Sequence, residues 1–464
     1  MDPLVDPLPL RGAGPRPRVA VVGSGVAGLV AGYLLSGRAD VTLYEADARL
    51  GGHAHTQQVE VDGHPVAVDT GFIVHNDRTY PTLVRLFAEL GIETQETQMS
   101  MSVRCDETGL EYAGARGLGG LFAQPRALAR PAYLLMLAEV ARFHRRARTV
   151  LALPETHAGA GETLEVFLDR GGFSAFFRDH FMTPVVAAVW STAPGVALEF
   201  PARYLFAFLE HHGMLTVFGS PTWRTVVGGS QRYVERVAAA LHEVRCSSPV
   251  TGLSETPDGV EITVGRGTTA RYDAAVVATH PHQALAILAS PSTVQRDVLG
   301  AMTYSVNLAQ LHTDTSLLPR AERARASWNY LRRPERDDVV VSYDLTRLQR
   351  LDRAASGARL ILTLGAPDLV DPATVLSTTI YEHPRYTPEF VAAQRSLPLI
   401  DTGRVVFAGA YHGWGFHEDG AASGARAAAR LGAGWPEPVS AGGHEARPSA
   451  HSDAVVATGH GATA

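Results

Sequence analysis

A glycine-rich segment between a short apolar run and a helical apolar pattern constrains the fold of this chain most. The run from Val19 to Val22 leads into Gly-Ser-Gly-Val-Ala-Gly. In this pattern the first glycine turns the chain, the second lets a pyrophosphate approach the backbone, and the third lets helix and strand pack closely. The helix N-terminus also offers N–H groups to phosphates. The segment is therefore a candidate dinucleotide site formed by Gly23, Ser24, Gly25, Val26, Ala27 and Gly28.

An acidic residue stands at the distance that such a site requires. A second apolar run, Val41 to Tyr44, ends in Glu45, which lies 22 residues after Gly23. At this position a carboxylate can accept hydrogen bonds from the ribose hydroxyls. An ordinary glycine-rich turn is the alternative, but the strand before, the helix after and the acid at this spacing favour dinucleotide binding. The fingerprint alone does not choose between NAD and FAD.

The residues that follow Glu45 favour FAD. Ala46 leads to Arg49-Leu50-Gly51-Gly52-His53, which resembles the Glu, then Arg-x-Gly-Gly, of the flavin amine oxidase and phytoene desaturase superfamily. In that superfamily the Gly-Gly pair lets the chain pass close against the flavin diphosphate and ring. The resemblance implies FAD as cofactor. It also implies an α/β fold with a discontinuous Rossmann-type FAD-binding domain and an α+β substrate-binding domain.

Two segments in the first two thirds of the chain extend the resemblance. The run Asp69-Thr70-Gly71-Phe72 ends a strand and leads into a helix, as in the superfamily's exit from its first FAD segment. Asp69 is either a flavin-proximal residue or an acid that caps a turn, and the sequence leaves both roles open. Gly228-Gly229 then opens a helix, and the strands that follow contain Val250, a candidate adenine contact by position, and end at Ala278.

A third segment near the C-terminus resembles the superfamily's last FAD motif. A strand ends in Gly409-Ala410, and a loop leads to Gly420-Ala421, which opens an alanine-rich helix. Many flavoproteins have an acid in place of Ala410 to hold the ribityl chain. Glu418 or Asp419 is the candidate substitute. The loop also supplies residues expected near the flavin ring: Tyr411, His412, Trp414, Phe416 and His417.

These segments predict the organisation of the chain. The expected FAD-binding domain consists of residues 18–75, 225–290 and 399–435. The expected substrate-binding domain consists of residues 76–224 and 291–398. Residues 1–17, rich in proline and glycine, are expected to be a flexible leader, and residues 436–464 a disordered tail.

Composition argues against several classes of partner. The formal net charge of −6 gives no basic footprint for nucleic acid. Cys105 and Cys246 are too few for a disulfide framework, which favours a cytoplasmic protein. No apolar run reaches the length of about 18 residues that a membrane span needs. The helical run from Pro131 to Leu153 has a basic end, for which a solvated face is favoured and contact with an anionic membrane surface is the alternative.

Every one of the 41 Lys+Arg residues is arginine, so no lysine can act as a base or a Schiff-base former. Amine oxidases of the superfamily typically hold a water near flavin N5 with a lysine. The corresponding stretch here reads Tyr304-Ser305-Val306-Asn307, which makes Asn307 a candidate catalytic residue. His280 and His282 have no further ligand at suitable spacing, so no metal site is predicted. An aromatic cluster comprises Trp190, Phe200, Tyr204, Phe206 and Phe208. The sequence leaves open whether these residues belong to the core or form the wall of a substrate tunnel.

A closer resemblance suggests the substrate. Gly-Gly-His-Ala-His-Thr, Ser-Trp-Asn-Tyr and Gly-Phe-His-Glu-Asp-Gly are similar to bacterial FAD-binding proteins related to the flavin domain that precedes plant cyclopropane fatty acid synthases. This implies an oxidoreductase, desaturase or isomerase that abstracts hydride from a small-molecule or lipid substrate, with His412 or His417 as proton acceptor. An amine oxidase and a catalytically silent partner of a lipid-modifying methyltransferase are the alternatives.

Overall fold

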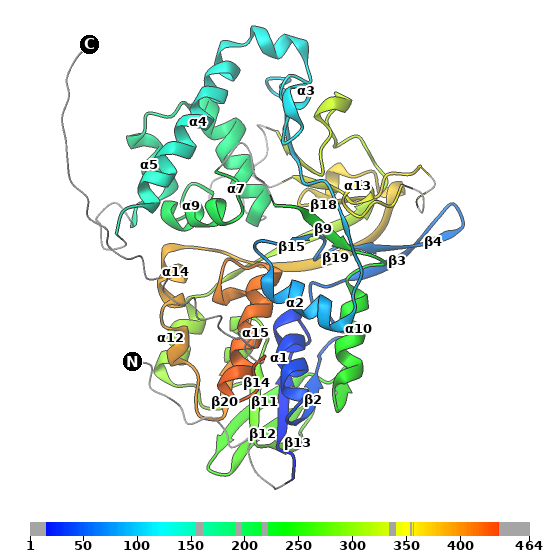
Figure 1. Cartoon of the computed structure of the whole chain (residues 1–464), viewed down its shortest axis with the longest axis vertical. Coiled ribbons are helices and arrows are strands. Elements are labelled where there is room, and N and C mark those ends of the chain that lie inside the picture. The colour runs from blue at the N-terminus through cyan, green and yellow to red at the C-terminus, as the bar shows by residue number, and fades with distance from the viewer. Residues whose placement is uncertain are drawn as a thin grey trace, which may run out of the picture. The chain divides into compact units, whose positions relative to one another are not determined.

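A five-stranded parallel sheet carries the glycine fingerprint. In the computed structural model of the protein, the strand order is β10-β2-β1-β14-β20 (Figure 1). The central strand β1 (Arg18–Val22) pairs with β2 (Asp40–Tyr44) and β14 (Ala274–Val277), and β10 (Glu243–Arg245) and β20 (Val405–Phe407) lie at the edges. Residues 19–22 are at most 4% exposed. Their continuous apolar sequence is typical of a parallel strand buried on both faces.

The structure describes residues 15–154, 161–190, 197–215, 221–333, 340–352, 355 and 357–435. Within these, the strands of the parallel sheet come from all three segments expected to bind FAD, so the predicted α/β fold with a discontinuous Rossmann-type sheet is confirmed. The domain boundaries stay a prediction, because Met1–Gly434 forms one compact unit. The expected tail, residues 436–464, lies outside the described residues.

Two helices pack closely beside the parallel sheet. Helix α1 (Val26–Ser36) begins at the fingerprint, and α15 (His417–Arg430) follows the last predicted FAD segment. The two helices lie side by side (Figure 1). A Cβ atom on Gly424 of α15 would overlap the carbonyl oxygen of Ala27, and one on Gly420 would lie 2.6 Å from the Val26 side chain. The small residues that read as an alanine-rich helix therefore allow this approach.

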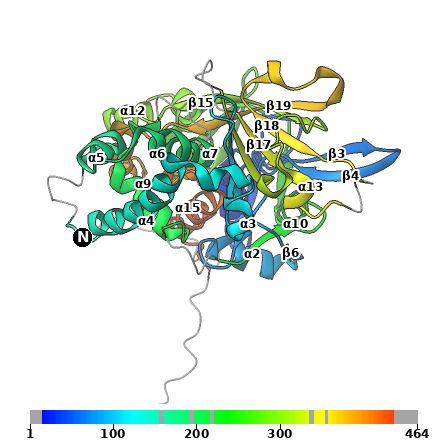
Figure 2. The same ribbon diagram turned by 90° about the horizontal axis from the view of Figure 1, so that it is seen from above.

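A seven-stranded mixed sheet forms the part of the fold expected to bind substrate. Its order is β19-β15-β18-β17-β16-β7-β8, and its strands are β7 (Met101–Cys105), β8 (Glu111–Gly114), β15 (Tyr304–His312), β16 (Trp328–Arg332), β17 (Val341–Asp344), β18 (Ile361–Leu364) and β19 (Val375–Pro384). Figure 2 shows a group of helices to one side of this sheet, which are α4 (Pro131–Leu151), α5 (Leu164–Arg170), α6 (Ala175–Phe177), α7 (Thr183–Trp190) and α9 (Ala202–His211).

The remaining elements connect or support these two sheets. The smaller sheets contain β3 (Thr56–Val61), β4 (His64–Asp69), β5 (His75–Asn76), β6 (Thr94–Glu96), β9 (Trp223–Val226), β11 (Val250–Thr256), β12 (Gly259–Val264) and β13 (Thr268–Tyr272). The other α-helices are α2 (Pro81–Leu90), α3 (Gly117–Leu121), α10 (Gln231–Ala240), α11 (Pro281–Ile287), α12 (Thr293–Gly300), α13 (Leu345–Leu348) and α14 (Pro388–Gln394).

The structure bears on two further predictions, which concern the leader and the basic helix. Of the predicted leader, residues 15–17 are described, and there Arg16 donates to the carbonyl oxygens of Ser36 and Ala39 at 2.6 and 3.0 Å. These bonds tie the last part of the leader to the end of α1. The predicted basic helix is α4, and among the described helices none has both the length and the apolar character needed to cross a bilayer.

The contact between α1 and α15 predicts the effect of one added methyl group. Gly424→Ala should lower the free energy of unfolding by about 1–3 kcal/mol, because the methyl group has to displace the Ala27 carbonyl. Helix propensity alone would favour alanine by about 1 kcal/mol. Thermal unfolding should place Gly424→Ala below the wild type and the control Gly37→Ala level with it, since Gly37 has a right-handed backbone and no atom nearer than 3.8 Å. A raised midpoint for Gly424→Ala would contradict this.

Candidate functional site

The first loop of the site depends on two glycines that accept no side chain. Gly23 has φ +99°, and a Cβ atom there would lie 2.9 Å from the carbonyl oxygen of Ala278. A Cβ on Gly28 would overlap the carbonyl oxygen of Gly23. Both substitutions would force the backbone apart. The predicted roles of Gly23 in the turn and of Gly28 in packing helix against strand therefore agree with the geometry.

Gly25 differs because a Cβ atom there would face open space, with no protein atom within 4 Å. Gly25 is the N-cap of α1, and no side-chain hydrogen bond caps this helix. The first-turn N–H groups, which include those of Val26 and Ala27, therefore border that space. A Cβ on Gly52 would lie 3.1 Å from Gly25 Cα, so the Gly51-Gly52 loop passes directly over the turn. These features fit a diphosphate on the helix N-terminus.

Glu45 lies beside this loop. Its Oε2 accepts hydrogen bonds from Ser24 N and Ser24 Oγ at 2.9 and 2.5 Å, and its Oε1 accepts one from Asp47 N at 2.9 Å. The carboxylate thus stands at the end of β2 next to the glycine turn, as predicted for a ribose-binding acid. Exposed Ala46 follows it, and Ser248 N donates to Glu45 O at 2.8 Å, which brings the start of β11 at Val250 near the same end of the sheet.

The chain from Thr70 to Phe72 lies directly against the loop that contains Arg49 to His53. Phe72 N donates to His53 O at 2.7 Å, and Thr70 N donates to His55 O at 2.9 Å. A Cβ on Gly71 would overlap the His53 carbonyl, so only glycine allows this crossing. The predicted cofactor residues from Arg49 to His53 and from Thr70 to Phe72 therefore form one surface.

The hydrogen bonds of Asp69 favour one of the two roles that the sequence left open, which is the capping of a turn. Both carboxylate oxygens accept from Ser230 N at 2.9 Å, and Oδ1 also accepts from Ser230 Oγ at 2.7 Å and Thr56 Oγ1 at 2.6 Å. The side chain is 1% exposed. Burial raises the pKa of this carboxyl, and the hydrogen bonds lower it. Asp69 therefore caps the turn that starts α10, and it joins the first and second FAD segments.

The last segment completes this surface. Gly409 N donates to Ser423 Oγ at 2.9 Å, and Ser423 Oγ donates to Gly420 O at 2.7 Å, which fixes the loop against the start of α15. Gly420 and Ala421 are buried, whereas Ala410 is half-buried. The loop between Ala410 and Gly420 contains the residues predicted to lie near the flavin ring. It brings them next to side chains from residues 18–75 and 225–290.

His417 is enclosed by two of these side chains. Its ring stacks on Phe72 with a centroid separation of 3.9 Å and an interplanar angle of 7°, and its Nε2 lies 2.7 Å from Tyr233 Oη. Burial lowers the pKa of His417 to about 3. The role of His417 as a proton acceptor stays a prediction, and in these surroundings its imidazole is neutral and a weak base at pH 7.

His412 lies in similar surroundings. Burial, and secondarily the charge of Arg426, lowers its pKa to about 3. Among the described residues, three buried polar atoms of this loop have no hydrogen-bond partner: Tyr411 Oη, His412 Nε2 and Trp414 Nε1. Buried polar groups are usually paired, so these atoms mark the loop as a place where a ligand can supply partners.

The acids expected to replace the ribityl-binding carboxylate have other partners. Glu418 accepts from Thr82 N at 2.8 Å and Leu83 N at 3.0 Å, so it caps the N-terminus of α2 and does not fit the predicted role. Asp419 Oδ2 accepts from Phe416 N at 2.9 Å, and burial raises the pKa of Asp419 to about 7. Asp419 is left as the candidate, held at the start of α15.

Asn307 belongs to a polar group that the sequence indicated only in part. Its Nδ2 lies 2.8 Å from His383 Nδ1 and 3.2 Å from Ser305 Oγ. The ring of His53 lies 5.7 Å from that of His383 and 5.1 Å from that of Tyr381. His383 and Tyr381 were missed, although their alternation along β19 places both on one face of the strand.

The aromatic cluster is mainly core. Trp190 and Phe206 are 4% and 0% exposed. Trp190 Nε1 donates to Trp414 O at 3.1 Å, and Phe208 stacks on Phe416 at 5.0 Å, so α7 and α9 hold the flavin-proximal loop in place. Tyr204 of this cluster is half-buried, as are Trp414 and Phe416 of the loop against which the cluster packs.

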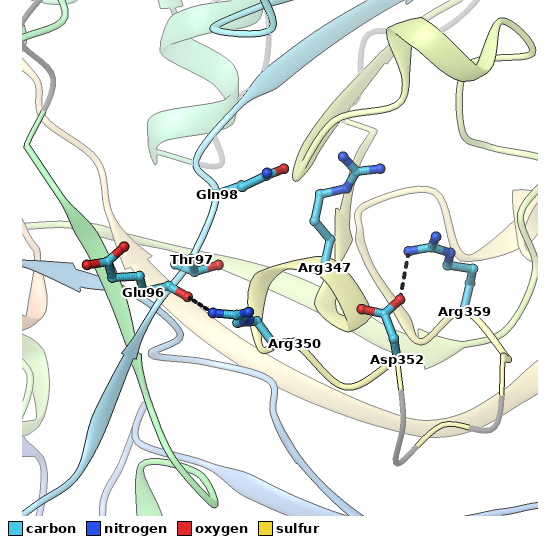
Figure 3. Close-up of a pocket in the computed structure, with 7 residues that line it drawn as sticks. All are labelled: Glu96, Thr97, Gln98, Arg347, Arg350, Asp352 and Arg359. Atoms are coloured by element: carbon cyan, nitrogen blue, oxygen red, sulfur yellow. Dashed lines mark hydrogen bonds and ion pairs between the residues drawn. The ribbon is translucent and has the colours of Figure 1, made fainter.

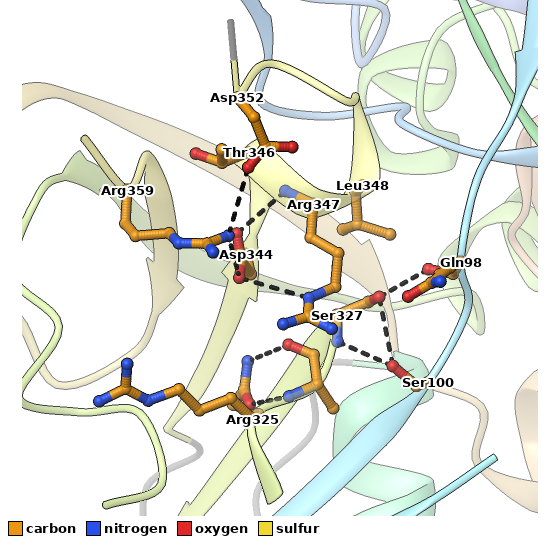
Figure 4. Close-up of polar contacts among 12 residues, drawn as sticks. Gln98, Ser100, Arg325, Ser327, Asp344, Thr346, Arg347, Leu348, Asp352 and Arg359 are labelled. Atoms are coloured by element: carbon orange, nitrogen blue, oxygen red, sulfur yellow. Dashed lines mark hydrogen bonds and ion pairs between the residues drawn. The ribbon is translucent and has the colours of Figure 1, made fainter. Parts of the chain in front are cut away.

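A separate hollow of about 430 Å³ lies on the seven-stranded sheet side, lined by Glu96, Thr97, Gln98, Arg347, Arg350, Asp352 and Arg359 (Figure 3). Its arginines are paired, since Arg347 and Arg359 lie 3.6 and 3.3 Å from Asp344 (Figure 4). Gln349 of the same segment donates to Asp69 O at 2.9 Å. The hollow is lined by none of the predicted site residues.

Comparison with known proteins identifies a family. The sequence profile described as flavin containing amine oxidoreductase matches residues 26–432. Tryptophan 2-monooxygenase of Pantoea agglomerans pv. gypsophilae is 35% identical over 116 residues, which are 24% of this chain and 20% of that protein. This chain thus matches only about a fifth of that relative's length.

Two solved structures share the fold over almost their whole length. Cyclohexylamine oxidase from Brevibacterium oxydans IH-35A has a TM-score of 0.64 and 19% identity, with 90% of this chain and 99% of that chain covered. The CLA-producing fatty acid isomerase from P. acnes has a TM-score of 0.63 and 16% identity, with 89% and 98% covered. At these identities the similarity establishes the fold.

The enclosed histidines predict a stability that falls in mild acid. Burial lowers the pKa from 6.5 to about 3 or 4 for His55, His75, His212, His312, His383, His412 and His417. Below pH 6.5 the unfolded chain binds more protons than the folded one, so each histidine costs about 1.4 kcal/mol per pH unit. The free energy of unfolding measured with urea should fall steeply from pH 7 to pH 5. His417→Gln should reduce the slope and exposed His64→Gln should not; equal slopes for all three would contradict this.

Proposed function

The chain belongs to the family of flavin containing amine oxidoreductases, and on this premise we propose that it oxidises a lipophilic substrate, an unsaturated or modified fatty acyl chain. Members of the family are FAD-dependent oxidoreductases. FAD, when bound, supplies a two-electron acceptor for hydride from a substrate C–H bond. The residues that would hold its diphosphate and ribose are the glycine turn with the first turn of α1, and Glu45.

The apolar character of the substrate wall carries the proposal. Trp414 and Phe416 are half-buried and are backed by the aromatic residues of α7 and α9. Tyr204 and Tyr386 both direct their hydroxyls to Gly413 O, at 2.8 and 2.9 Å, so their polar ends are used within the protein. Apart from Trp414 Nε1, which has no hydrogen-bond partner among the described residues, this wall consists of ring surface, which suits a hydrocarbon chain.

The proposed site also contains neutral polar groups. Asn307 belongs to the stretch that the resemblance matches to the neighbourhood of the amine oxidases' lysine, and its amide is paired with His383. Burial lowers the pKa of His383 to about 4, so this pair is uncharged at neutral pH. An uncharged amide–imidazole pair can orient a double bond or a carboxyl end by hydrogen bonding, and it holds the position without a water-binding ammonium.

A flavin amine oxidase is the second candidate. It is favoured by the family profile and by the likeness to cyclohexylamine oxidase, whereas the likeness to a fatty acid isomerase accords with an acyl chain. Both likenesses are to the fold. A catalytically silent partner of a lipid-modifying methyltransferase is the third candidate, and with it goes the proposed resemblance to the flavin domain of plant cyclopropane fatty acid synthases.

An anaerobic screen distinguishes the three candidates. The purified yellow protein should lose its flavin absorbance with an unsaturated or methyl-branched fatty acid and keep it with cyclohexylamine or putrescine. Peroxide release with the amines in air would instead favour the amine oxidase. No reduction by any compound, together with co-purification of a methyltransferase, would favour the silent partner.

Asn307 gives this screen a matched variant. Asn307→Leu should slow reduction of the flavin by the acyl substrate by about tenfold or more, because one neutral hydrogen bond that orients the substrate is lost. FAD content and unfolding temperature should stay at the wild-type values. Val306→Leu, on the adjacent residue whose side chain is 67% exposed, is the control. Equal reduction rates for all three proteins would remove Asn307 from the site.

The cofactor site has a separate test in Gly25. Gly25→Val should yield colourless protein that unfolds at the temperature of the FAD-free wild type, because the new side chain meets no protein atom but fills the space for the diphosphate. Gly119→Val, where a Cβ is equally free, should stay yellow. A yellow Gly25→Val protein would contradict the assignment of the diphosphate to this turn.

A further inference from the structure

Two histidines that the proposed reaction does not use lie beside a carboxylate from a distant part of the chain. His280 is the N-cap of α11, and His282 is the second residue of that helix. Glu382 belongs to β19, 100 residues after His282. Glu382 Oε2 lies 2.7 Å from His280 Nδ1 and 3.8 Å from His282 Nε2. The sequence spacing around the two histidines indicated no further ligand, because the third ligand, Glu382, comes from β19, far along the chain.

The backbone holds the three side chains at this place. Pro281 separates the histidines and starts α11, while His280 N donates to Gln283 Oε1 at 3.1 Å. The His280 ring stacks on Tyr304 of β15 at 4.5 Å. Glu382 pairs in register with Val306 of the same strand. The donors are therefore presented from fixed elements.

The chemistry of the three donors fits a divalent transition metal. Their ligand atoms, two imidazole nitrogens and one carboxylate oxygen, all lie within 4.8 Å of one another. A Zn²⁺ ion at about 2.0–2.2 Å from each atom requires the ligand atoms to lie within about 4.4 Å of one another. Glu382 Oε2 lies 2.7 and 3.8 Å from the two imidazole nitrogens, which is within this limit. Imidazole with carboxylate is a donor set for first-row divalent ions, and calcium and magnesium prefer oxygen alone.

The surroundings leave the site accessible and the acid without a fixed cation. The side chains of His280, His282 and Glu382 are 30%, 53% and 31% exposed, so an ion can enter and water can complete its coordination. Within the part of the chain that the structure describes, the ion pairs of Glu382 are with these two histidines, and no arginine shares it. In a protein with 41 Lys+Arg, this carboxylate is partnered by metal-binding side chains.

We propose that His280, His282 and Glu382 bind one divalent transition-metal ion of the Zn²⁺ class, with water as the remaining ligand. The ion would link α11, which begins where β14 of the parallel sheet ends, to β19 of the seven-stranded sheet. Its role is a cross-link between the two sheets. The inference does not depend on the substrate of the flavin site.

Zinc binding to the yellow, full-length protein tests the proposal. After removal of metals with a chelator, the protein is loaded with ZnCl₂ alone, passed through a desalting column and analysed for zinc. The wild type should retain one zinc per chain, and its unfolding temperature should rise with zinc. Glu382→Gln and His282→Asn should each weaken zinc binding at least about tenfold and lose the temperature shift, since one of three ligands is removed.

His64→Asn is the matched control, because His64 is exposed and belongs to no group of potential ligands among the described residues. It should bind zinc as the wild type does. Flavin absorbance and circular dichroism verify that each variant is folded, and exposed His282 tolerates substitution even if Glu382→Gln unfolds. Absence of retained zinc, or equal retention by all four proteins, would overturn the proposal and leave Glu382 as a hydrogen-bond partner of His280 alone.

Discussion

The close passage of three backbone segments over one another is the constraint on which the site depends. Gly28 allows α1 to start directly above the turn at Gly23, Gly52 passes over Gly25, and Gly424 lets α15 approach Ala27. At each crossing except Gly25, a methyl group would meet protein. Among the glycines at these crossings, only Gly25 faces open space. The same residue type thus serves packing at several positions and ligand access at one, and the parallel sheet sets where these crossings occur.

Polar groups around this frame are mostly satisfied within the protein and kept neutral. Asp69 is used to join two segments, Glu418 caps α2, and His417 is enclosed between Phe72 and Tyr233. Enclosure of the imidazoles of His412 and His417 lowers their pKa values, so both are neutral and weak bases at pH 7. The aromatic rings at Trp414 and Phe416 and the amide–imidazole pair of Asn307 and His383 are the observations from which we propose an apolar substrate.

Much of this could be predicted from the sequence because the chemistry depends on local spacing. The glycine turn, Glu45 and the Gly51-Gly52 pair are each defined by a few residues around a strand end. The roles of Glu418 and Glu382 could not be predicted, because each depends on an element packed from far along the chain. The burial of His412 and His417 could not be predicted for a related reason, and burial determines the pKa.

The central claim is that a lipophilic acyl chain donates hydride at this site. The most direct measurement compares anaerobic flavin reduction by a fatty acid carrying hydrogen with reduction by the same acid fully deuterated along its chain. The account predicts bleaching with both and a markedly slower rate with the deuterated acid, because a C–H bond is broken in the step. Equal rates with the two acids, or bleaching by amines alone, would contradict it.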